Sequence, residues 1–164
     1  MDTKFLGIYL NDHLAGSTVG LEMAKRAAGS NEGSELGDFL AKLAAEIEEE
    51  RDTLKSIMEH LEVGENKVKV PMAWTAEKLG RLKPNGQLTG YSPLSRLVEL
   101  EVLALGVTGK LGMWRALSET RTDLTSFPLE TLIGQAEAQQ EALEARRLEA
   151  AKLAFGEAAV SGAP

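Results

Sequence analysis

The chain has 164 residues and no cysteine, and its 25 acidic and 18 basic side chains give a net charge of −7. This length suits one domain with its own hydrophobic core. The missing cysteines exclude disulfides, thiolate nucleophiles and zinc–thiolate sites, and the acidic balance disfavours a nucleic-acid-binding surface, which needs clustered basic side chains. No apolar run approaches the roughly 20 residues of a transmembrane helix, and residues 5–10 are too short an apolar stretch for a signal peptide. We expect a soluble, cytoplasmic protein with neither a membrane nor a nucleic-acid partner.

Two helical segments are predicted in the first third of the chain. The first spans about residues 4–28, where leucines recur on one face, and Gly29 is expected to end it. The second begins at Ser34, a favourable N-cap, and its apolar residues recur every three or four positions as far as about Leu61. Because the loop between them is short, the two segments should pack as antiparallel neighbours.

Two further segments are predicted in the second half of the chain. The third begins at Ser92 and Pro93, a hydroxyl cap followed by proline at the first helical position, and it runs to about residue 117. The fourth spans about residues 126–155. Residues 1–155 are therefore expected to form one helical-bundle domain, and the small residues of 156–164 a flexible C-terminal tail.

The connection between the second and third segments, residues 62–91, is far longer than the usual bundle loop of about 2–8 residues. It contains a short predicted helix at residues 75–82 and a basic cluster, Lys78, Arg81 and Lys83. We interpret it as an amphipathic strap on the bundle, with an anion-binding patch as the alternative. A crossover of this length lets the second and third segments run parallel. In an all-α four-helix bundle, one such crossover is the ferritin-like topology.

Two glutamates occupy positions on predicted apolar helix faces. Glu50 fills the slot between Ile47 and Leu54 in the second segment, and Glu101 in the third has Leu105 as an i+4 neighbour. A carboxylate in an apolar seam needs a cation, a metal ion, a hydrogen-bond donor or a proton. What these two glutamates contact therefore separates a metal protein from a bundle with a neutralised polar core.

Relative helix heights, taken from a rise of about 1.5 Å per residue, predict how such a core would neutralise itself. Glu101 falls level with Arg147 on the fourth segment, which predicts a buried ion pair. Glu50 falls level with Gln140 and Ser17, which can both donate hydrogen bonds to a carboxylate. A layer of these five residues would need no metal.

The third segment is apolar on nearly all sides over residues 97–109. Glycines at every third position over residues 106–112, and Gly16 and Gly20 in the first segment, would let helices approach closely. The segment either packs tightly inside one bundle or presents a second face to another subunit. Because its outer apolar side chains would otherwise stay uncovered, we expect a homodimer through this helix.

One resemblance rests on residues 80–117, which read GRLKPNGQLTGYSPLSRLVELEVLALGVTGKLGMWRAL. This run resembles a group of uncharacterised bacterial helical proteins placed near the ferritin-like superfamily, and the topology expected for the whole chain is similar to that superfamily. In its di-iron members the resemblance implies a glutamate from each of two helices and a Glu-x-x-His motif from each of the other two. Neither His13 nor His60 completes such a motif, and His13 is interpreted as a half-buried packing residue. An all-carboxylate set would draw on Glu46, Glu49, Glu50, Glu101 and either Glu137 or Glu141.

Two functions stay open from the sequence. The first is a non-catalytic helical protein, without cofactor, that acts by self-association or by binding another protein. The second is a di-metal carboxylate protein, holding Fe or Mn, with redox or metal-storage activity. A small-molecule pocket between the helices is a third option. Under the first function the two glutamates contact Arg147, Gln140 and Ser17, whereas under the second they converge with His13 or further carboxylates on a metal.

Overall fold

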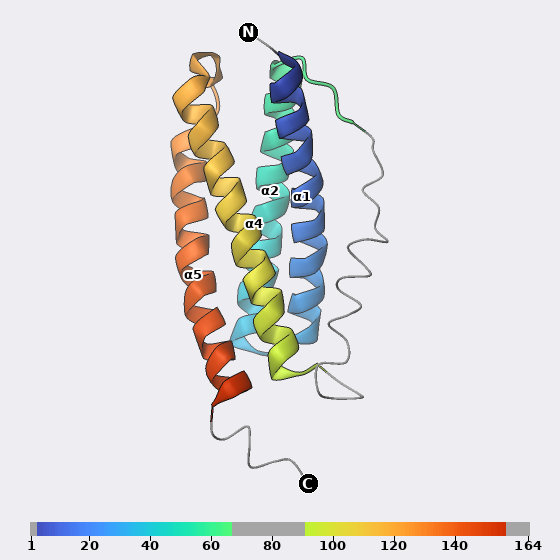
Figure 1. Ribbon diagram of the computed structural model, residues 1–164, viewed down its shortest axis with the longest axis vertical. Coiled ribbons are helices and arrows are strands. Elements are labelled where there is room, and N and C mark those ends of the chain that lie inside the picture. Colours follow the sequence, from blue (N-terminus) through green and yellow to red (C-terminus); the bar gives the residue numbers. More distant parts are fainter. Residues whose placement is uncertain (1–2, 67–90, 157–164) are drawn as a thin grey trace.

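The computed structural model describes residues 3–66 and 91–156 (Figure 1). Within these ranges the chain forms four long α-helices and one short 3-10 helix, with no strand. These elements are α1 (Thr3–Ser30), α2 (Glu35–His60), α4 (Pro93–Thr120), η1 (Thr122–Leu124) and α5 (Leu129–Phe155). The predicted all-α four-helix bundle is confirmed.

Two helices begin at the serine caps that the sequence predicted. The Ser34 hydroxyl accepts a hydrogen bond from the Gly37 amide at 3.2 Å, at the start of α2. The Ser92 hydroxyl accepts one from the Ser95 amide at 3.1 Å, and Pro93 follows as the first residue of α4. Each cap satisfies a backbone N–H that has no partner inside its helix.

The turn between α1 and α2 differs from the prediction at its glycines. The first helix does not end at Gly29 but continues to Ser30, and Gly33 takes the left-handed conformation, with φ of +77°. Gly37 allows the turn to lie close to α2, because a Cβ atom there would stand 2.2 Å from the Asn31 carbonyl oxygen. The glycine with a left-handed backbone conformation in this turn is therefore Gly33, four residues after the Gly29 that the sequence predicted.

The helices pack as two antiparallel pairs, α1 with α2 and α4 with α5, and α1 also lies against α4 (Figure 1). Helices α2 and α4 run in the same direction, because both begin at the same end of the bundle. At that end the Asn31 amide, just before α2, donates to the Tyr91 hydroxyl, just before α4, at 3.1 Å. At the opposite end the His60 ring packs edge-on against Phe127, which lies between α4 and α5.

The first residues after α2 are held on α1. The Asn11 side chain donates to the Gly64 carbonyl oxygen at 3.1 Å and accepts from the Asn66 amide at 2.6 Å. Residues 67–90 and 157–164 lie outside the described residues. The expected helix at 75–82, its basic cluster and most of the expected C-terminal tail lie there too.

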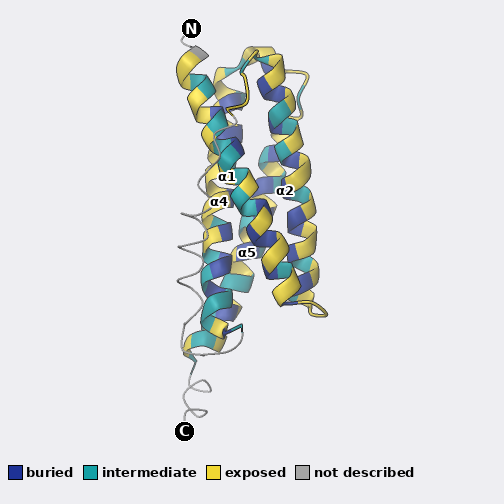
Figure 2. Ribbon diagram, turned by 90° about the vertical axis from the view of Figure 1, so that its right-hand side faces the viewer, coloured by how far each residue is buried: buried dark blue, intermediate teal, exposed yellow. Residues whose placement is uncertain are grey.

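Apolar side chains fill the interior in two clusters, one nearer each end of the bundle. Figure 2 shows buried and exposed residues alternating along the helices. The cluster near the α1–α2 turn is built mainly from Leu21, Met23, Leu40, Leu43, Leu97, Leu100, Leu103, Val107 and Leu143. The cluster near the α4–α5 turn is built mainly from Leu10, Leu14, Leu54, Ile57, Met58, Leu111, Met113, Trp114, Leu117, Leu124 and Leu132. The apolar seam predicted on α2 faces this interior.

The buried stripe of α5 is displaced by one position in its middle. It passes through Leu132 and Gln139, which are buried, whereas Ile133 and the predicted core residue Gln140 are only half-buried. Spacings of three and four both fit a helix that turns every 3.6 residues, so the sequence leaves either position open. The displacement decides which glutamine meets the polar centre of the bundle.

Candidate functional site

A buried ion pair lies between the two apolar clusters. Glu50 of α2 is only 3% exposed, and its carboxylate contacts the Lys110 ammonium of α4. The same ammonium contacts the Gln139 side-chain oxygen of α5. The Gln139 side-chain nitrogen donates to Glu50 at 3.1 Å and to Glu46 at 2.8 Å. Three helices therefore contribute to one closed polar network in the middle of the core.

Burial sets the protonation behaviour of this network. Loss of water raises the pKa of Glu50, although the Lys110 charge and the hydrogen bonds from Lys110 and Gln139 oppose that rise. Burial also lowers the pKa of Lys110, against the attraction of Glu50 and Glu46. Each charge is stable in the core because the other is present.

The partners predicted for Glu50 are wrong. Gln140 lies on the outer side of the α5 stripe and donates to the Thr108 hydroxyl at 2.9 Å. The Ser17 hydroxyl donates to the Leu14 carbonyl oxygen of its own helix at 2.7 Å. The predicted height of Glu50 along α5 is right, but the residue of α5 that faces the interior at that height is Gln139, next to Gln140.

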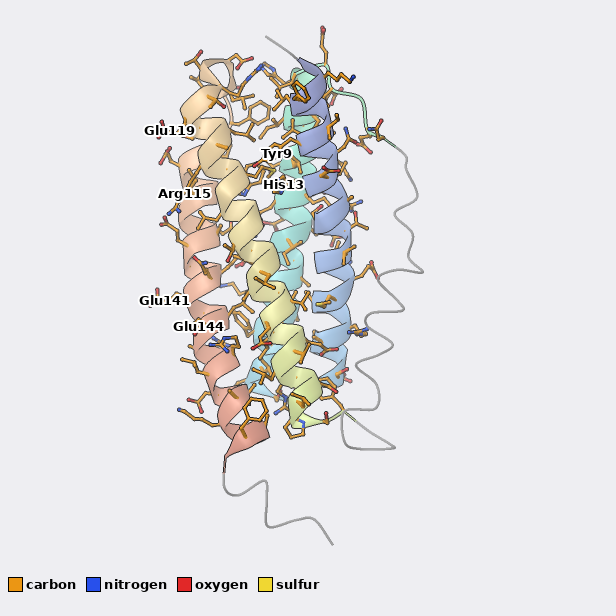
Figure 3. The ribbon with its side chains drawn as sticks, viewed as in Figure 1. Tyr9, His13, Arg115, Glu119, Glu141 and Glu144 are labelled. Carbon is orange, nitrogen blue, oxygen red and sulfur yellow. The ribbon has the colours of Figure 1, made fainter. Side chains whose placement is uncertain are left out.

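The predicted pair of Glu101 and Arg147 forms, but it is not buried. The Arg147 guanidinium lies 3.4 Å from the Glu101 carboxylate, and 45% of the Glu101 side chain is exposed. Arg147 makes shorter bonds, of 2.7 and 2.8 Å, to Glu144 one turn earlier, on the outer edge of α5 (Figure 3). Because α4 is apolar on nearly all sides, the apolar neighbours of Glu101 do not indicate which face of α4 packs against the core. The buried-layer prediction is therefore wrong for both residues.

The buried glutamate of α4 is Glu99, which sequence reasoning missed. Its carboxylate accepts from the Arg26 guanidinium at 2.7 Å and from the Tyr91 hydroxyl at 2.8 Å. Asn31 donates to the same hydroxyl, which closes a second polar network near the α1–α2 turn. Burial and the nearby Glu99 charge raise the pKa of Tyr91 to about 12. This network joins the starts of α2 and α4 to the end of α1.

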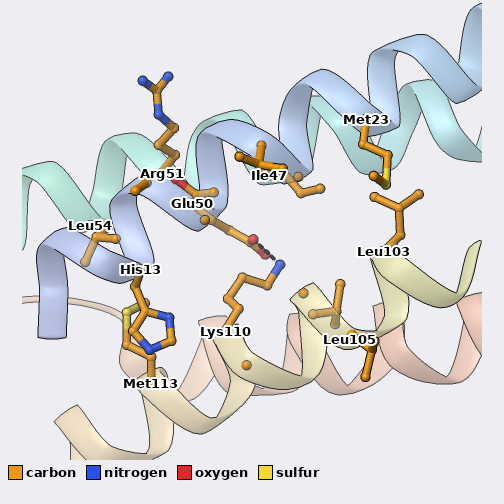
Figure 4. Close-up of a pocket in the computed structure, with 18 of the residues that line it drawn as sticks. His13, Met23, Ile47, Glu50, Arg51, Leu54, Leu103, Leu105, Lys110 and Met113 are labelled. Atoms are coloured by element: carbon orange, nitrogen blue, oxygen red, sulfur yellow. Dashed lines mark hydrogen bonds and ion pairs between the residues drawn. The ribbon is translucent and has the colours of Figure 1, made fainter. Parts of the chain in front are cut away.

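A groove of about 540 Å³ opens between α1, α2 and α4, beside the Glu50–Lys110 pair. Figure 4 shows Glu50 and Lys110 extending toward each other across it, with His13 near one end and Met23 near the other. Its walls are largely apolar, including Met23, Ile47, Leu54, Leu103, Val107, Met113 and Trp114.

Glycines on two helices keep this groove open. Gly16 and Gly20 of α1 and Gly106 and Gly109 of α4 all line it. A Cβ atom built at any of the four meets no other atom within 4 Å. The prediction that these glycines bring helices into close contact is therefore wrong for the described residues: α1 and α4 stand apart at this level, and the glycines border empty space.

His13 lies at one end of the groove, in the half-buried position that the sequence predicted. Its ring packs edge-on against Tyr9, with 4.6 Å between ring centroids (Figure 3). Loss of water lowers the pKa of His13, and the attraction of Asp12 only partly offsets this. The ring is thus favoured in its neutral form.

Two residues that line the groove carry a buried N–H group without a hydrogen-bond partner. They are Trp114, at its indole nitrogen Nε1, and Arg51, at Nε. Buried N–H groups in proteins are nearly always paired, so each needs an explanation. The Arg51 guanidinium points away from the Glu50–Lys110 pair in Figure 4, which leaves Trp114 as the unpaired donor within the wall.

The residues present do not fit a di-metal centre. The Glu50 carboxylate already accepts from Lys110 and Gln139, and an ammonium beside it repels a metal cation. Glu101 lies at the surface with Arg147 instead of facing Glu50. In residues 3–66 and 91–156, no group of three or more His, Asp or Glu side chains is arranged to hold a metal ion.

One signal in the sequence could have indicated Lys110. It is the only basic residue of α4 between Arg96 and Arg115, and it lies one turn before Trp114 in an otherwise apolar stretch. A lone lysine among apolar residues is a natural partner for a lone buried glutamate. Gln139 and Glu99 carry no comparable signal, because each lies beside another residue of the same type or charge class one or two positions away.

Comparison of the chain with known protein families, curated proteins and solved structures finds no match. Within the described part of the chain, no helix combines the length and the apolar character needed to cross a membrane.

Proposed function

We propose that the protein is a non-catalytic binding protein of ferritin-like topology, and that the groove between α1, α2 and α4 is its binding site. Its volume of about 540 Å³ falls in the range of ligand pockets, about 300–1,000 Å³. The observation that carries the proposal is the set of four glycines that border this space instead of filling it.

The polar residues beside the groove support binding rather than catalysis. An acid or base catalyst needs a proton that it can exchange with a substrate. Glu50 is 3% exposed and both of its oxygens are occupied, one by Lys110 and one by Gln139. The pair is suited to a structural task, since it spaces α2 and α4 at the level of the groove.

The ferritin-like topology is supported by the two antiparallel helix pairs and by the parallel directions of α2 and α4. These are the relationships that one long crossover produces in a four-helix bundle. The chemistry of the di-iron members of that superfamily is not proposed, because the donor set does not fit it.

The groove is tested with the uncharged apolar dye N-phenyl-1-naphthylamine, whose fluorescence rises in an apolar site. Gly106→Leu places a side chain in the groove, whereas Gly112→Leu makes the same change on the same helix outside the groove lining. A Cβ atom has open space at both positions, so neither change creates a clash at its first carbon. We expect the dye to bind the wild type and Gly112→Leu alike, and Gly106→Leu about tenfold more weakly or worse.

Equal dye binding by all three proteins would place the dye elsewhere on the surface. No binding by the wild type would mean that the groove admits no small apolar molecule. Either result overturns the proposal, provided that circular dichroism shows all three proteins to be folded.

A second candidate function is self-association, which two apolar side chains on the rim of the groove favour. Leu105 of α4 is 72% exposed and Val102 is 38% exposed, and both lie at the mouth of the groove. A second copy of the chain packed on α4 would cover them. The homodimer therefore stays a prediction, and its test is given in the Discussion.

A further inference from the structure

We infer that α4 packs antiparallel on α4 of a second copy of the chain, in a two-fold symmetric dimer where the branched apolar side chains of each copy meet the glycines of the other. The inference rests on the second candidate function, self-association, and it specifies the direction and the register of the partner helix. Its evidence is the order of residues along the outer face of α4 and the position of two charges at the edge of that face.

Helix α4 carries a second apolar stripe on the side opposite its buried face. Successive positions of this stripe are four, three, four, three and four residues apart, which is the spacing of a seam between two packed helices. The outer stripe consists of Val98, Val102, Leu105, Gly109, Gly112 and Ala116. Val98 is half-buried and the other positions are exposed, Leu105 by 72%. The described helices of one copy therefore leave this stripe uncovered.

Side-chain size divides the outer stripe into two halves. Its first three positions are branched residues, and its last three are two glycines and an alanine. In an antiparallel pair centred between Leu105 and Gly109, every branched residue of one copy meets a glycine or alanine of the other. The contacts, each made twice, are Leu105 with Gly109, Val102 with Gly112 and Val98 with Ala116. A parallel pair would instead set Leu105 against Leu105 and Gly112 against Gly112, which crowds one end of the contact and leaves a gap at the other.

The charges of α4 fit the same arrangement. Between Glu101 and Arg115 its only charged residue is Lys110, which turns into the core to contact Glu50. Glu101 and Arg115 lie on one edge of the outer stripe, since both contact α5, and their side chains are 45% and 56% exposed. In the antiparallel pair, Glu101 of one copy comes within about 3 Å, along the helix axis, of the level of Arg115 of the other. Opposite charges therefore meet at both ends of an uncharged contact.

The outer stripe and the groove share one border but can be changed separately. Val102, Leu105 and Gly109 belong to the stripe and also line the groove. Gly112 and Ala116 belong to the stripe but lie outside the groove lining. A side chain added at Gly112 therefore fills the proposed dimer contact without filling the groove.

The first test compares the mass of the wild type with that of two glycine variants by light scattering over a range of concentrations. Gly112→Leu puts a branched side chain where Val102 of the second copy would pack, whereas Gly134→Leu makes the same change at an exposed glycine of α5. A Cβ atom at either position meets nothing within 4 Å inside one copy. We expect dimers of the wild type and of Gly134→Leu, and a dimer of Gly112→Leu that is weaker by about tenfold or more.

The second test measures the direction of the partner helix. Because the chain has no cysteine, a single introduced cysteine can be linked only to its own copy in the partner. In the antiparallel pair the two copies of Thr108 lie about 3 Å apart along the helix axis, and the two copies of Ala116 roughly 27 Å apart. Both residues are exposed. A short bis-maleimide should therefore link Thr108→Cys into a covalent dimer but not Ala116→Cys, whereas a parallel pair would link both.

The outcomes separate the inference from the proposed binding site. A dimer that Gly112→Leu does not weaken, a dimer in which Thr108→Cys is not linked, or linkage of Ala116→Cys overturns the inference. A wild type that is monomeric at every concentration overturns it too, and is the result expected if some other molecule or segment covers the outer stripe. Dye binding by monomeric Gly112→Leu supports the groove whatever the fate of the dimer. A correctly linked dimer whose groove binds no dye overturns the proposed binding site and leaves the inference standing.

Discussion

Lys110 of α4 contacts Glu50 of α2 in the centre of the bundle, at the boundary between its two apolar clusters. The two residues are 60 positions apart in the chain and belong to different helix pairs. Their contact is one of several polar links between those pairs in the described part of the chain, and it fixes the height of α4 against α2. A one-turn slip of either helix would bury both charges without partners.

Removal of Lys110 alone should be strongly destabilising. Lys110→Met leaves the Glu50 carboxylate in the core with only Gln139, and such a change typically costs about 3–5 kcal/mol of unfolding free energy. The double variant Glu50→Leu with Lys110→Met should recover most of that loss, because no charge remains buried. Urea unfolding of the three proteins measures the difference.

Arg147→Ala is the control for this pair, since it removes a cation from a solvent-exposed carboxylate contact. We expect its unfolding midpoint to stay close to that of the wild type. A loss as large as that of Lys110→Met would mean that the Glu101–Arg147 contact is buried after all.

His13 should make the protein less stable as the pH falls. Burial lowers its pKa below the ordinary value of 6.5, so the unfolded chain takes up a proton at a pH where the folded chain does not. Stability is therefore lost as the pH falls from above 6.5 through the pKa of the folded state. In His13→Gln this contribution is absent, so the unfolding free energy of the variant relative to that of the wild type should rise as the pH falls from 7.5 to 5.5. Parallel pH profiles of the two proteins would show that the ring is fully hydrated.

Tyr91 should stabilise the bundle through its hydroxyl. Tyr91→Phe removes a donor to the buried Glu99 carboxylate and an acceptor for Asn31, which we expect to cost about 1–2 kcal/mol. Thermal unfolding followed by circular dichroism measures the loss. Tyr9→Phe, on a partly exposed ring of α1, is the matched control and should change little. Equal midpoints for the two variants would argue against the network.

Self-association through α4 predicts a dimeric mass in light scattering at high protein concentration. Leu105→Lys should then yield a monomer, because it places a charge on the exposed apolar rim of α4. Leu153→Lys introduces the same charge on α5, where the leucine is 57% exposed, and should leave the dimer intact. A wild type that is monomeric at every concentration rules out this face as an interface.

Metal binding should be absent from the polar centre. After growth with added iron and manganese, elemental analysis of the purified, untagged protein should find neither metal above background, because Lys110 and Gln139 occupy the Glu50 carboxylate. One or two metal ions per chain, lost in Glu50→Ala, would contradict this and restore the di-metal hypothesis.

The helices could be predicted from the sequence because their signals are local. Serine caps at Ser34 and Ser92 and the regular apolar spacing on α2 depend only on neighbours within a few residues. The burial of Glu50 could be predicted for the same reason. Its partner could not, because α2 and α4 meet through side-chain packing that no local pattern encodes.

The candidate site was the least predictable part of the chain. The choice between Gln139 and Gln140, or between Glu99 and Glu101, depends on a helix rotation of one or two residues, which a height argument does not resolve. The groove was missed because glycines in helices were interpreted as points of contact. A sequence shows that a side chain is missing, but it does not show what fills the space.

The glycines of the groove also bear on how this chain trades stability against function. Glycine in a helix interior is less favourable than alanine by about 0.5–1 kcal/mol, and α1 and α4 carry two such residues each along the groove. Alanine would fit at all four positions, since a Cβ atom there meets nothing. A sequence selected only for a robust bundle would hold alanines there and be stiffer for it. This protein instead keeps glycine at all four positions, which leaves the groove between α1 and α4 open. Such a loss of stability is expected where the open groove is itself the property under selection.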